Sequence, residues 1–189
     1  MPDAGMLGLF GGAFDPPHRG HVELLRQAKE KLGLDDAIVL VAADPGHKHV
    51  DTPAAVRLRL AQSAFPSERV VLDDYARTVD MLRAHPEWRD AVFLVGADEF
   101  SDFAAWKEPD EVLHLVRLGV ATRPGFPRAQ LDAVLRRLQH PERVTFFELD
   151  PMPVASRDLR SLLETGAEVN SDIPEETLAI IRDEELYTR

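Results

Sequence analysis

The sequence predicts an α/β fold of the doubly wound type, with a mainly parallel sheet and additional helices toward the C-terminus. Two observations support this prediction. Short apolar runs alternate with amphipathic stretches along the chain, which is the order expected of strands joined by crossover helices. Most of these runs are continuously apolar rather than alternating, as in parallel strands that are buried on both faces.

The strands are expected where the apolar runs lie. The first run, MLGLFG, leads into a glycine-rich turn, and the second and fourth, AIVLVAA and AVFLVG, are apolar throughout. Short continuous apolar runs of this kind are typical of buried strands. The six expected strands occupy residues 6–11, 37–43, 69–73, 91–96, 118–122 and 143–149.

The stretches between the strands have the period of amphipathic helices. In the first of them apolar residues recur every three or four positions, and Gly33 suits the end of the helix. In the last, Pro174 suits the first helical turn. Helices are expected over residues 21–34, 54–65, 78–85, 109–116, 129–139, 156–166 and 174–186.

The composition is that of an ordinary globular chain. Its 189 residues, 44% of them hydrophobic, are enough for one domain over 1–189, with a helical C-terminal part from about 156 to 189. The chain has no cysteine, which excludes a disulfide framework, thiol catalysis and cysteine-ligated zinc. Neither a secretory signal nor an apolar run long enough for a membrane span is recognised, so a cytoplasmic protein is expected.

The charge of the chain limits its partners. A net charge of −11 argues against nucleic acid, because binding to a phosphate backbone uses clustered Lys and Arg. A membrane partner is not expected either. An acidic exterior still allows a small phosphate-bearing ligand that is held in a local basic pocket.

Three segments at strand ends are candidates for a ligand site. In doubly wound sheets ligands bind beyond the carboxyl ends of the strands. The first, second and fourth strands are followed by Gly11–His21, Asp44–Lys48 and Gly96–Asp98. We expect these three segments to share one rim of the sheet.

The stretch GGAFDPPHRGH combines the features of a phosphate site. Its paired glycines, Gly11 and Gly12, allow a tight turn and close approach of a ligand to the backbone. Asp15 is placed to cap the helix that follows, and the N-terminus of a helix attracts phosphate. His18 and His21, three residues apart on the first helical turn, are expected to project to the same side. These features predict a polyphosphate site.

Two other interpretations of the histidines stay open. Each histidine taken alone is most often an incidental surface or capping residue. A histidine pair also binds zinc, although no clear third ligand and no cysteine accompany this pair. The full arrangement, in which Gly20 between the two histidines leaves room for a ligand against the backbone, favours phosphate.

The stretch GGAFDPPHRGH resembles the G-G-x-F-D-P-x-H-x-G-H signature of the nucleotidyltransferase superfamily with an H-x-G-H motif. Within that superfamily it is most similar to the bacterial nicotinate-nucleotide adenylyltransferases. The resemblance covers nearly the whole chain and implies a Rossmann-like fold of the nucleotidyltransferase type. It also rests on VGADEFSDFAAWK (95–107) for the family's G-x-D…W-K block, TRPG (122–125) for R-P-G, GHKH (46–49) for P-H-K, TVDML (78–82) for the end of S-Y-T-x-x-T-L, VASRDLR (154–160) for I-S-S-T-x-I-R, and IPEETLAIIRDEELY for the closing helix.

The resemblance implies a reaction, adenylyl transfer from ATP to nicotinate mononucleotide, which gives deamido-NAD and pyrophosphate in NAD biosynthesis. Mg²⁺ is implied as a cofactor held mainly through the ATP phosphates, without a protein metal site. The implied catalytic residues are His18, His21, Lys48 and Arg160. The implied ATP-binding residues are Gly11, Gly12, Ala13, Phe14, His18, His21, Gly96, Asp98, Ser156 and Arg160. The implied mononucleotide-binding residues are Thr78, Trp106, Arg123 and Arg77.

Some of these residues also carry a physical argument of their own. Asp98 follows a strand-ending glycine, where a carboxylate can hold ribose hydroxyls, and helix capping is the alternative. Ser156 and Arg160 lie four residues apart at an expected helix start. That spacing suits a second phosphate clamp or, alternatively, an N-cap serine beside an exposed arginine. Trp106 and Trp88 are core residues by default, and the resemblance implies that Trp106 instead stacks on the pyridine ring.

The chain departs from the family pattern in two blocks. S-Y-T becomes Ala76-Arg77-Thr78, and I-S-S-T becomes Val154-Ala155-Ser156-Arg157. The lost tyrosine and the gained Arg77 leave the preference between nicotinate and nicotinamide mononucleotide open. Another phosphorylated acceptor, such as phosphopantetheine, and a nucleotide-sensing module without catalysis are further alternatives. Monomer and homo-oligomer are equally compatible with the sequence.

Overall fold

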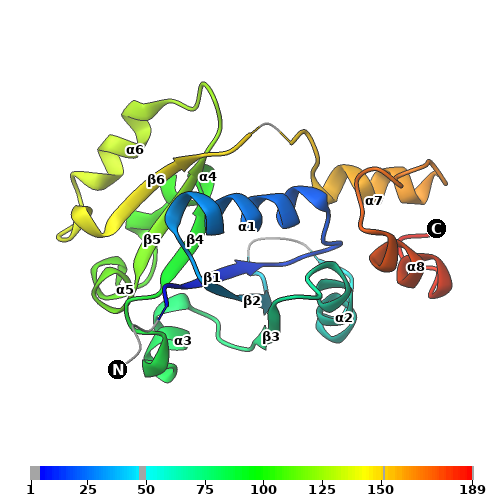
Figure 1. Cartoon of the computed structure of the whole chain (residues 1–189), viewed down its shortest axis with the longest axis horizontal. Coiled ribbons are helices and arrows are strands. Elements are labelled where there is room, and N and C mark those ends of the chain that lie inside the picture. The colour runs from blue at the N-terminus through cyan, green and yellow to red at the C-terminus, as the bar shows by residue number, and fades with distance from the viewer. Residues whose placement is uncertain (1–4, 47–49, 151, 189) are drawn as a thin grey trace.

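A computed structural model describes residues 5–46, 50–150 and 152–188. In this part of the chain six strands form one sheet in the order β3-β2-β1-β4-β5-β6 (Figure 1). All five pairs of neighbouring strands are parallel, so the predicted doubly wound fold is confirmed. The strands are β1 (Leu7–Gly12), β2 (Asp36–Ala42), β3 (Arg69–Asp73), β4 (Val92–Gly96), β5 (Arg117–Thr122) and β6 (Val144–Glu148).

Each of the seven predicted helices has a counterpart. The helices are α1 (Arg19–Leu32), α2 (Ala54–Ala64), α3 (Thr78–Ala84), α4 (Ala97–Ser101), α5 (Pro109–Leu115), α6 (Arg128–Leu135), α7 (Ser156–Glu164) and α8 (Glu175–Asp183). Gly33 ends α1 in the left-handed conformation, as predicted. The sequence prediction missed α4, because five residues are too few to show a helical period. It also made α6 too long, since the chain leaves the helix after Leu135.

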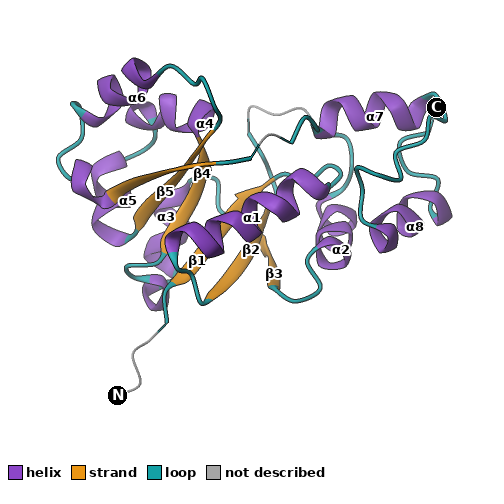
Figure 2. Cartoon of the chain, turned by 45° about the horizontal axis from the view of Figure 1, so that its top comes forward, coloured by secondary structure: helices purple, strands orange, loops and turns teal. Residues whose placement is uncertain are grey.

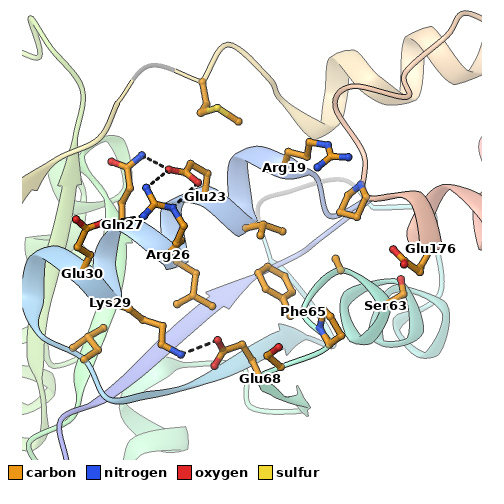
Figure 3. Close-up of a pocket in the computed structure, with 18 of the residues that line it drawn as sticks. Arg19, Glu23, Arg26, Gln27, Lys29, Glu30, Ser63, Phe65, Glu68 and Glu176 are labelled. Carbon is orange, nitrogen blue, oxygen red and sulfur yellow. Dashed lines mark hydrogen bonds and ion pairs between the residues drawn. The ribbon is translucent and has the colours of Figure 1, made fainter.

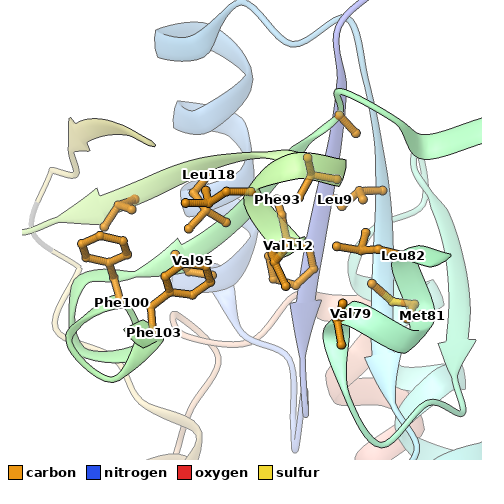
Figure 4. Packing of buried hydrophobic residues seen from close by; sticks show 14 of the residues in the cluster. Leu9, Val79, Met81, Leu82, Phe93, Val95, Phe100, Phe103, Val112 and Leu118 are labelled. Carbon is orange, nitrogen blue, oxygen red and sulfur yellow. The ribbon is translucent and has the colours of Figure 1, made fainter. Parts of the chain in front are cut away.

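The core lies on both faces of the sheet. On one face Phe10 of β1 packs with Leu25 of α1, and α2 joins the same cluster. On the other face Leu9 of β1 packs in a cluster with Val79 of α3 and Val112 of α5, to which α4 and α6 also contribute (Figure 4). Alternate residues of one strand thus serve opposite layers, which explains why the central strands are continuously apolar.

The C-terminal helices α7 and α8 lie beside α2, at the end of the molecule away from α6 (Figure 2). Leu60 of α2 is completely buried against Leu159 of α7 and Leu178 of α8. This third cluster attaches the last part of the chain to the layer of helices nearest to β2 and β3. In the part of the chain described here, no helix is both long and apolar enough to cross a membrane.

Candidate active site

The candidate site lies at the carboxyl ends of β1, β2 and β4. β1 pairs with β2 on one side and with β4 on the other, so the direction in which the chain progresses across the sheet reverses at β1. Such a reversal is where doubly wound proteins bind their ligands. The strand ends Gly12, Ala42 and Gly96 are therefore neighbours, which confirms the expected common rim. Lys48, predicted to reach phosphate from this rim, lies outside the described residues.

The turn after β1 is made differently from the prediction. Gly11 and Gly12 still belong to the strand and pair with β2. The residue that adopts a positive φ is Phe14, at 51°. A Cβ atom on Gly12 would lie 2.8 Å from the Phe14 ring, which is buried. Gly12 is therefore needed for the packing of that ring rather than for a tight turn.

His18 and His21 come together at the start of α1, as predicted. His18 is the N-cap residue and His21 lies on the first turn. Their rings are stacked, with centroids 3.7 Å apart and planes inclined by 26°. The backbone N–H of His18 donates to Nδ1 of His21 at 3.2 Å. Two imidazoles are thus presented together at a helix N-terminus, where the backbone itself favours anions.

Burial controls the charge of His18. Its side chain is only 6% exposed, and this desolvation lowers its pKa from 6.5 to about 4, against a smaller opposing effect of the Asp172 carboxylate. Within the described residues its Nδ1 atom is buried without a hydrogen-bond partner. His18 is therefore neutral at pH 7 before a ligand binds, and a neutral imidazole has one N–H donor to offer.

Two predicted roles around the histidines are wrong. Asp15 does not cap α1, because it is buried and its Oδ1 accepts a hydrogen bond from the Tyr187 hydroxyl at 2.7 Å. Gly20 does not leave room for a ligand at the backbone. A Cβ atom there would lie 2.7 Å from Val154 Cγ1 and 3.0 Å from the His18 ring. The protein itself fills that space.

Ser156 and Arg160 reach the same loop from α7. Ser156 is the first residue of this helix, after the N-cap Ala155, and its hydroxyl donates to the Pro16 carbonyl at 3.0 Å. Arg160 donates to the Asp15 carbonyl through Nη1. The serine is therefore not an N-cap, and the arginine is half-buried rather than free in solvent. Both predicted clamp residues therefore bind the backbone of the loop that precedes His18.

Asp98 and Arg123 form a polar pair on the far side of the rim. Arg123 Nη2 donates to Asp98 Oδ2 at 3.3 Å, and both side chains are about three-quarters exposed. Gly96, the N-cap of α4, faces open space, with no described atom within 4 Å of its Cβ position. A carboxylate and a guanidinium are thus accessible beside an unobstructed strand end.

The surroundings of Trp106 fit neither predicted role completely, that of a core residue or that of a ring free to stack on the pyridine. It is partly buried against the core cluster, with its ring 6.4 Å from Phe93 and 5.2 Å from Phe103 between centroids. It is therefore neither fully enclosed nor free. Trp88, predicted to be structural, is 4% exposed and stacks on His85, so that prediction is confirmed.

The segment containing Arg77 and Thr78 lies close to the segment of Trp106. Thr78 begins α3, and the exposed Arg77 precedes it as the N-cap. Lys107, the residue after Trp106, donates to both carboxylate oxygens of Asp80 on α3, each at 3.0 Å. This ion pair ties the tryptophan loop to the helix that carries Thr78, so these three predicted mononucleotide residues belong to one corner of the rim.

Sequence reasoning missed Arg57 of α2. The residue is 1% exposed, and its guanidinium donates to four backbone carbonyls: Ala13 and Ala42 at 2.8 Å, and Ala43 and Thr52 at 3.0 Å. It thereby joins the loop after β1 to the loop after β2. One sequence signal was available, because Arg57 occupies the buried face of α2 together with residues 60, 61 and 64.

A separate groove of about 990 Å³ runs along α1 (Figure 3). It is lined by α1, the connection between α2 and β3, and parts of the segment from 150 to 176. Its charged groups largely pair with one another, as Lys29 does with Glu68 at 2.8 Å. None of the predicted site residues that the structure describes lines this groove, so it is distinct from the candidate active site.

The fold and the site together define a class of protein. A parallel sheet with this strand order, a helix N-terminus at the reversal point and basic groups around it are the features of a nucleotide-binding α/β protein. Comparison with known proteins narrows the class. Residues 9–162 match the family model described as cytidylyltransferase-like.

Curated relatives and solved structures agree with this match. A Thermomicrobium roseum protein named "Probable nicotinate-nucleotide adenylyltransferase" is 35% identical over 89% of this chain and 85% of its own length. A Bordetella pertussis protein of the same name is 32% identical over 96% and 97%. The Plasmodium falciparum nicotinic acid mononucleotide adenylyltransferase complexed with NaAD has the same fold, with a TM-score of 0.77, 17% identity and 97% coverage of both chains. The chain therefore belongs to the cytidylyltransferase-like family and, within it, to the nicotinate-nucleotide adenylyltransferases.

Proposed function

We propose that this chain transfers the adenylyl group of ATP to nicotinate mononucleotide, forming deamido-NAD and pyrophosphate in NAD biosynthesis. The observation that carries the proposal is the stacked pair His18 and His21 at the N-terminus of α1, in a chain of this family. The pair lies at the reversal point of the sheet, where a nucleotide triphosphate would meet both imidazoles and the positive end of the helix dipole.

The chemistry requires no covalent protein intermediate. The phosphate of the mononucleotide attacks the α-phosphorus of ATP in line, a new P–O bond forms, and the bond to the β-phosphate oxygen breaks as pyrophosphate leaves. Catalysis is then a matter of holding the two phosphates in line and stabilising negative charge on the leaving group. Imidazole, guanidinium and backbone N–H donors are suited to both tasks.

In this proposal His18 and His21 donate to the ATP phosphates. The negative charge of a bound triphosphate would oppose the effect of burial and favour the protonated form of His18. Ser156 and Arg160 would contribute from α7. The Arg160 guanidinium has five N–H donors, and the one that contacts the Asp15 carbonyl is on Nη1. Lys48 remains a predicted phosphate contact.

Mg²⁺ would be held mainly by the ATP phosphates. Within the described residues no group of three or more His, Cys, Asp or Glu side chains could hold a metal ion. The rim carboxylates of Asp15 and Asp98 already face Tyr187 and Arg123. Mg²⁺ commonly keeps its waters and binds through substrate phosphates, so these residues fit that mode. When bound, it would neutralise charge on the phosphate oxygens.

The mononucleotide would occupy the corner that contains Thr78, Arg77 and Trp106, and Arg123, which pairs with Asp98 after β5, remains a predicted contact of it. An electron-rich indole can stack on the electron-poor pyridine ring, and a hydroxyl or guanidinium can bind the pyridine carboxylate.

A cytoplasmic location remains a prediction from the sequence.

The proposal is tested by measuring pyrophosphate release with Mg-ATP and, separately, nicotinate mononucleotide, nicotinamide mononucleotide or phosphopantetheine. We expect the highest kcat/KM with nicotinate mononucleotide. A higher value with either other acceptor would reassign the substrate. No release with any acceptor, despite ATP binding, would favour a nucleotide sensor.

The histidine pair is tested in the same assay. His18→Ala and His21→Ala are each expected to lower turnover by an amount equivalent to roughly 3–5 kcal/mol, because each removes a donor that stabilises the transition state. The fold should survive either change. His140→Ala is the control, since this half-exposed histidine precedes β6 and pairs with Glu142 at 3.2 Å. Turnover like that of the wild type in both active-site variants would contradict the mechanism.

A further inference from the structure

The loop that carries the histidines is held by side chains from the C-terminal part of the chain. Ser156 donates to the Pro16 carbonyl and Arg160 to the Asp15 carbonyl. Tyr187, near the C-terminus of the described chain, donates to the carboxylate of Asp15 at 2.7 Å. The contacts converge on Asp15 and Pro16, which lie three and two residues before His18.

The contact between Tyr187 and Asp15 is buried and specific. Asp15 is 3% exposed. Its Oδ1 accepts the hydrogen bond from the tyrosine hydroxyl. Its Oδ2 lies 3.8 Å from Arg160 Nη1 and has no hydrogen bond among the described residues. Burial raises the pKa of Tyr187, so the hydroxyl keeps its proton and remains a donor at neutral pH. Removing it would leave a buried carboxylate oxygen without that bond.

The backbone near Tyr187 is shaped to make this contact. Tyr187 has a φ of 60° and Glu185 a φ of 51°. Positive φ is uncommon for residues other than glycine and persists only where surrounding contacts stabilise it. The last turns of the chain therefore adopt an unfavourable conformation that brings the phenol to Asp15.

A rigid connection links Asp15 to the first imidazole. Only Pro16 and Pro17 separate Asp15 from His18, and the ring of each proline fixes its φ. The position of Asp15 therefore restricts where the backbone of His18 can lie. A displaced imidazole would be poorly aligned with a phosphate, and small misplacements of a catalytic group lower rates strongly.

We propose that Tyr187 is a positioning residue of the active site: its hydroxyl fixes the buried Asp15 carboxylate, and the two prolines carry that position to His18. This inference rests on the proposed function for its kinetic consequence, although the position of His18 can be measured without any reaction. It gives the C-terminal segment a role in catalysis without contact with substrate.

The test compares Tyr187→Phe, which removes only the hydroxyl, with Thr188→Val. Thr188 is the matched control because its hydroxyl bonds locally to the Glu185 carbonyl at 2.7 Å. We expect Y187F to lower kcat for pyrophosphate release by about 10- to 100-fold, with little change in the KM for nicotinate mononucleotide. T188V should match the wild type. In the ligand-free protein, the ¹⁵N-imidazole NMR signals of His18 should shift in Y187F and remain unchanged in T188V.

A double-mutant cycle with Asp15→Asn tests the route of the effect. If Tyr187 acts through Asp15, the losses of kcat in the two single variants will not add in the double variant. Unchanged kcat and unchanged His18 signals in Y187F would overturn the inference, and so would additive losses. Unfolding of Y187F would also overturn it, because the hydroxyl would then support the whole fold. If the wild type itself releases no pyrophosphate, the proposed function fails, while the NMR comparison still decides whether Tyr187 positions His18.

Discussion

At the scale of single residues, His18 shows how one side chain serves packing and chemistry together. Its ring lies against His21, and burial keeps it neutral until a ligand arrives. A bound phosphate would reverse this preference, so the charge needed for catalysis would develop where it is used.

The pKa of His18 predicts how stability depends on pH. In the folded protein this pKa is about 4, below the value of 6.5 that applies to the unfolded chain. As the pH falls from 6.5 toward 4, the unfolded chain binds a proton that the folded protein does not, so the free energy of unfolding decreases by up to about 3 kcal/mol. Urea unfolding at pH 7 and pH 4.5 should show a smaller decrease for His18→Gln than for the wild type. An equal decrease would contradict the assignment, and the exposed His114→Gln serves as the control.

Trp106 should contribute more to the acceptor site than to the ATP site. Trp106→Ala is expected to raise the KM for nicotinate mononucleotide more than the KM for ATP, because the indole would stack on the pyridine ring. Some stability will be lost as well, since the ring also packs on Phe93 and Phe103. Steady-state kinetics below the unfolding temperature separate the two effects. Trp106→Phe keeps an aromatic face and should be affected less, and a larger rise in the KM for ATP would remove Trp106 from this role.

The sequence predicts residue roles well where local chemistry determines them and poorly where distant contacts do. The spacing of His18 and His21 in the chain determines that they share one side of a helix. The roles of Asp15 and Arg57 depend on Tyr187 and on four carbonyls that are brought close only by the fold. Such long-range partners leave little trace in a short motif.

At the scale of elements, the start of α1 is the most constrained part of the site. Gly20 packs so closely against Val154 and the His18 ring that a methyl group would collide with both. Gly119 of β5 is equally close to Leu32, at the other end of the same helix. The two glycines therefore allow the packing of the two ends of α1 to be tested separately.

We predict different results for alanine at these two positions. Gly119→Ala should lower the free energy of unfolding by about 1–3 kcal/mol through overpacking, with kcat unchanged below the unfolding temperature. Gly20→Ala should also lower kcat, by about 10-fold or more, because the added methyl displaces the His18 ring. Urea unfolding and pyrophosphate release measure the two quantities. Equal losses of kcat in both variants would show that the packing of α1 as a whole, rather than its first turn, limits the rate.

The sequence also predicts most elements and misses those that tertiary contacts create. The central strands are continuous apolar runs, and long helices show their period. In contrast, α4 has five residues, and the turn at Phe14 uses a positive φ that favours glycine rather than phenylalanine. That turn is stabilised by the burial of the Phe14 ring, so local preference is overridden by packing.

At the scale of the whole molecule, the site lies between two halves of the sheet. β2 and β3 extend to one side of β1, and β4, β5 and β6 to the other. In the proposed function, a nucleotide bound at the reversal point contacts loops from both halves. Binding should therefore stabilise the whole fold rather than a single loop.

We expect a non-reactive ATP analogue with Mg²⁺ to raise the melting temperature. At a concentration of about 100 times its Kd, it should add about 2.7 kcal/mol to the free energy of unfolding. For a chain of this size that corresponds to a rise in Tm of roughly 5–11 °C. Differential scanning calorimetry of the wild type, His21→Ala and the control His140→Ala measures the shift. Equal shifts in all three proteins, at one fixed concentration of analogue, would show that His21 does not contact the nucleotide.

The four carbonyls held by Arg57 have a consequence for how the protein can vary. Two of them, on Ala43 and Thr52, belong to the two ends of one connecting segment. One side chain therefore fastens both attachment points of this segment to α2. Changes between these two points should therefore leave β2 and α2 in place, because each end of the segment is held independently. Arg57 in this way insulates the sheet and α2 from the segment that contains Lys48, the predicted phosphate contact.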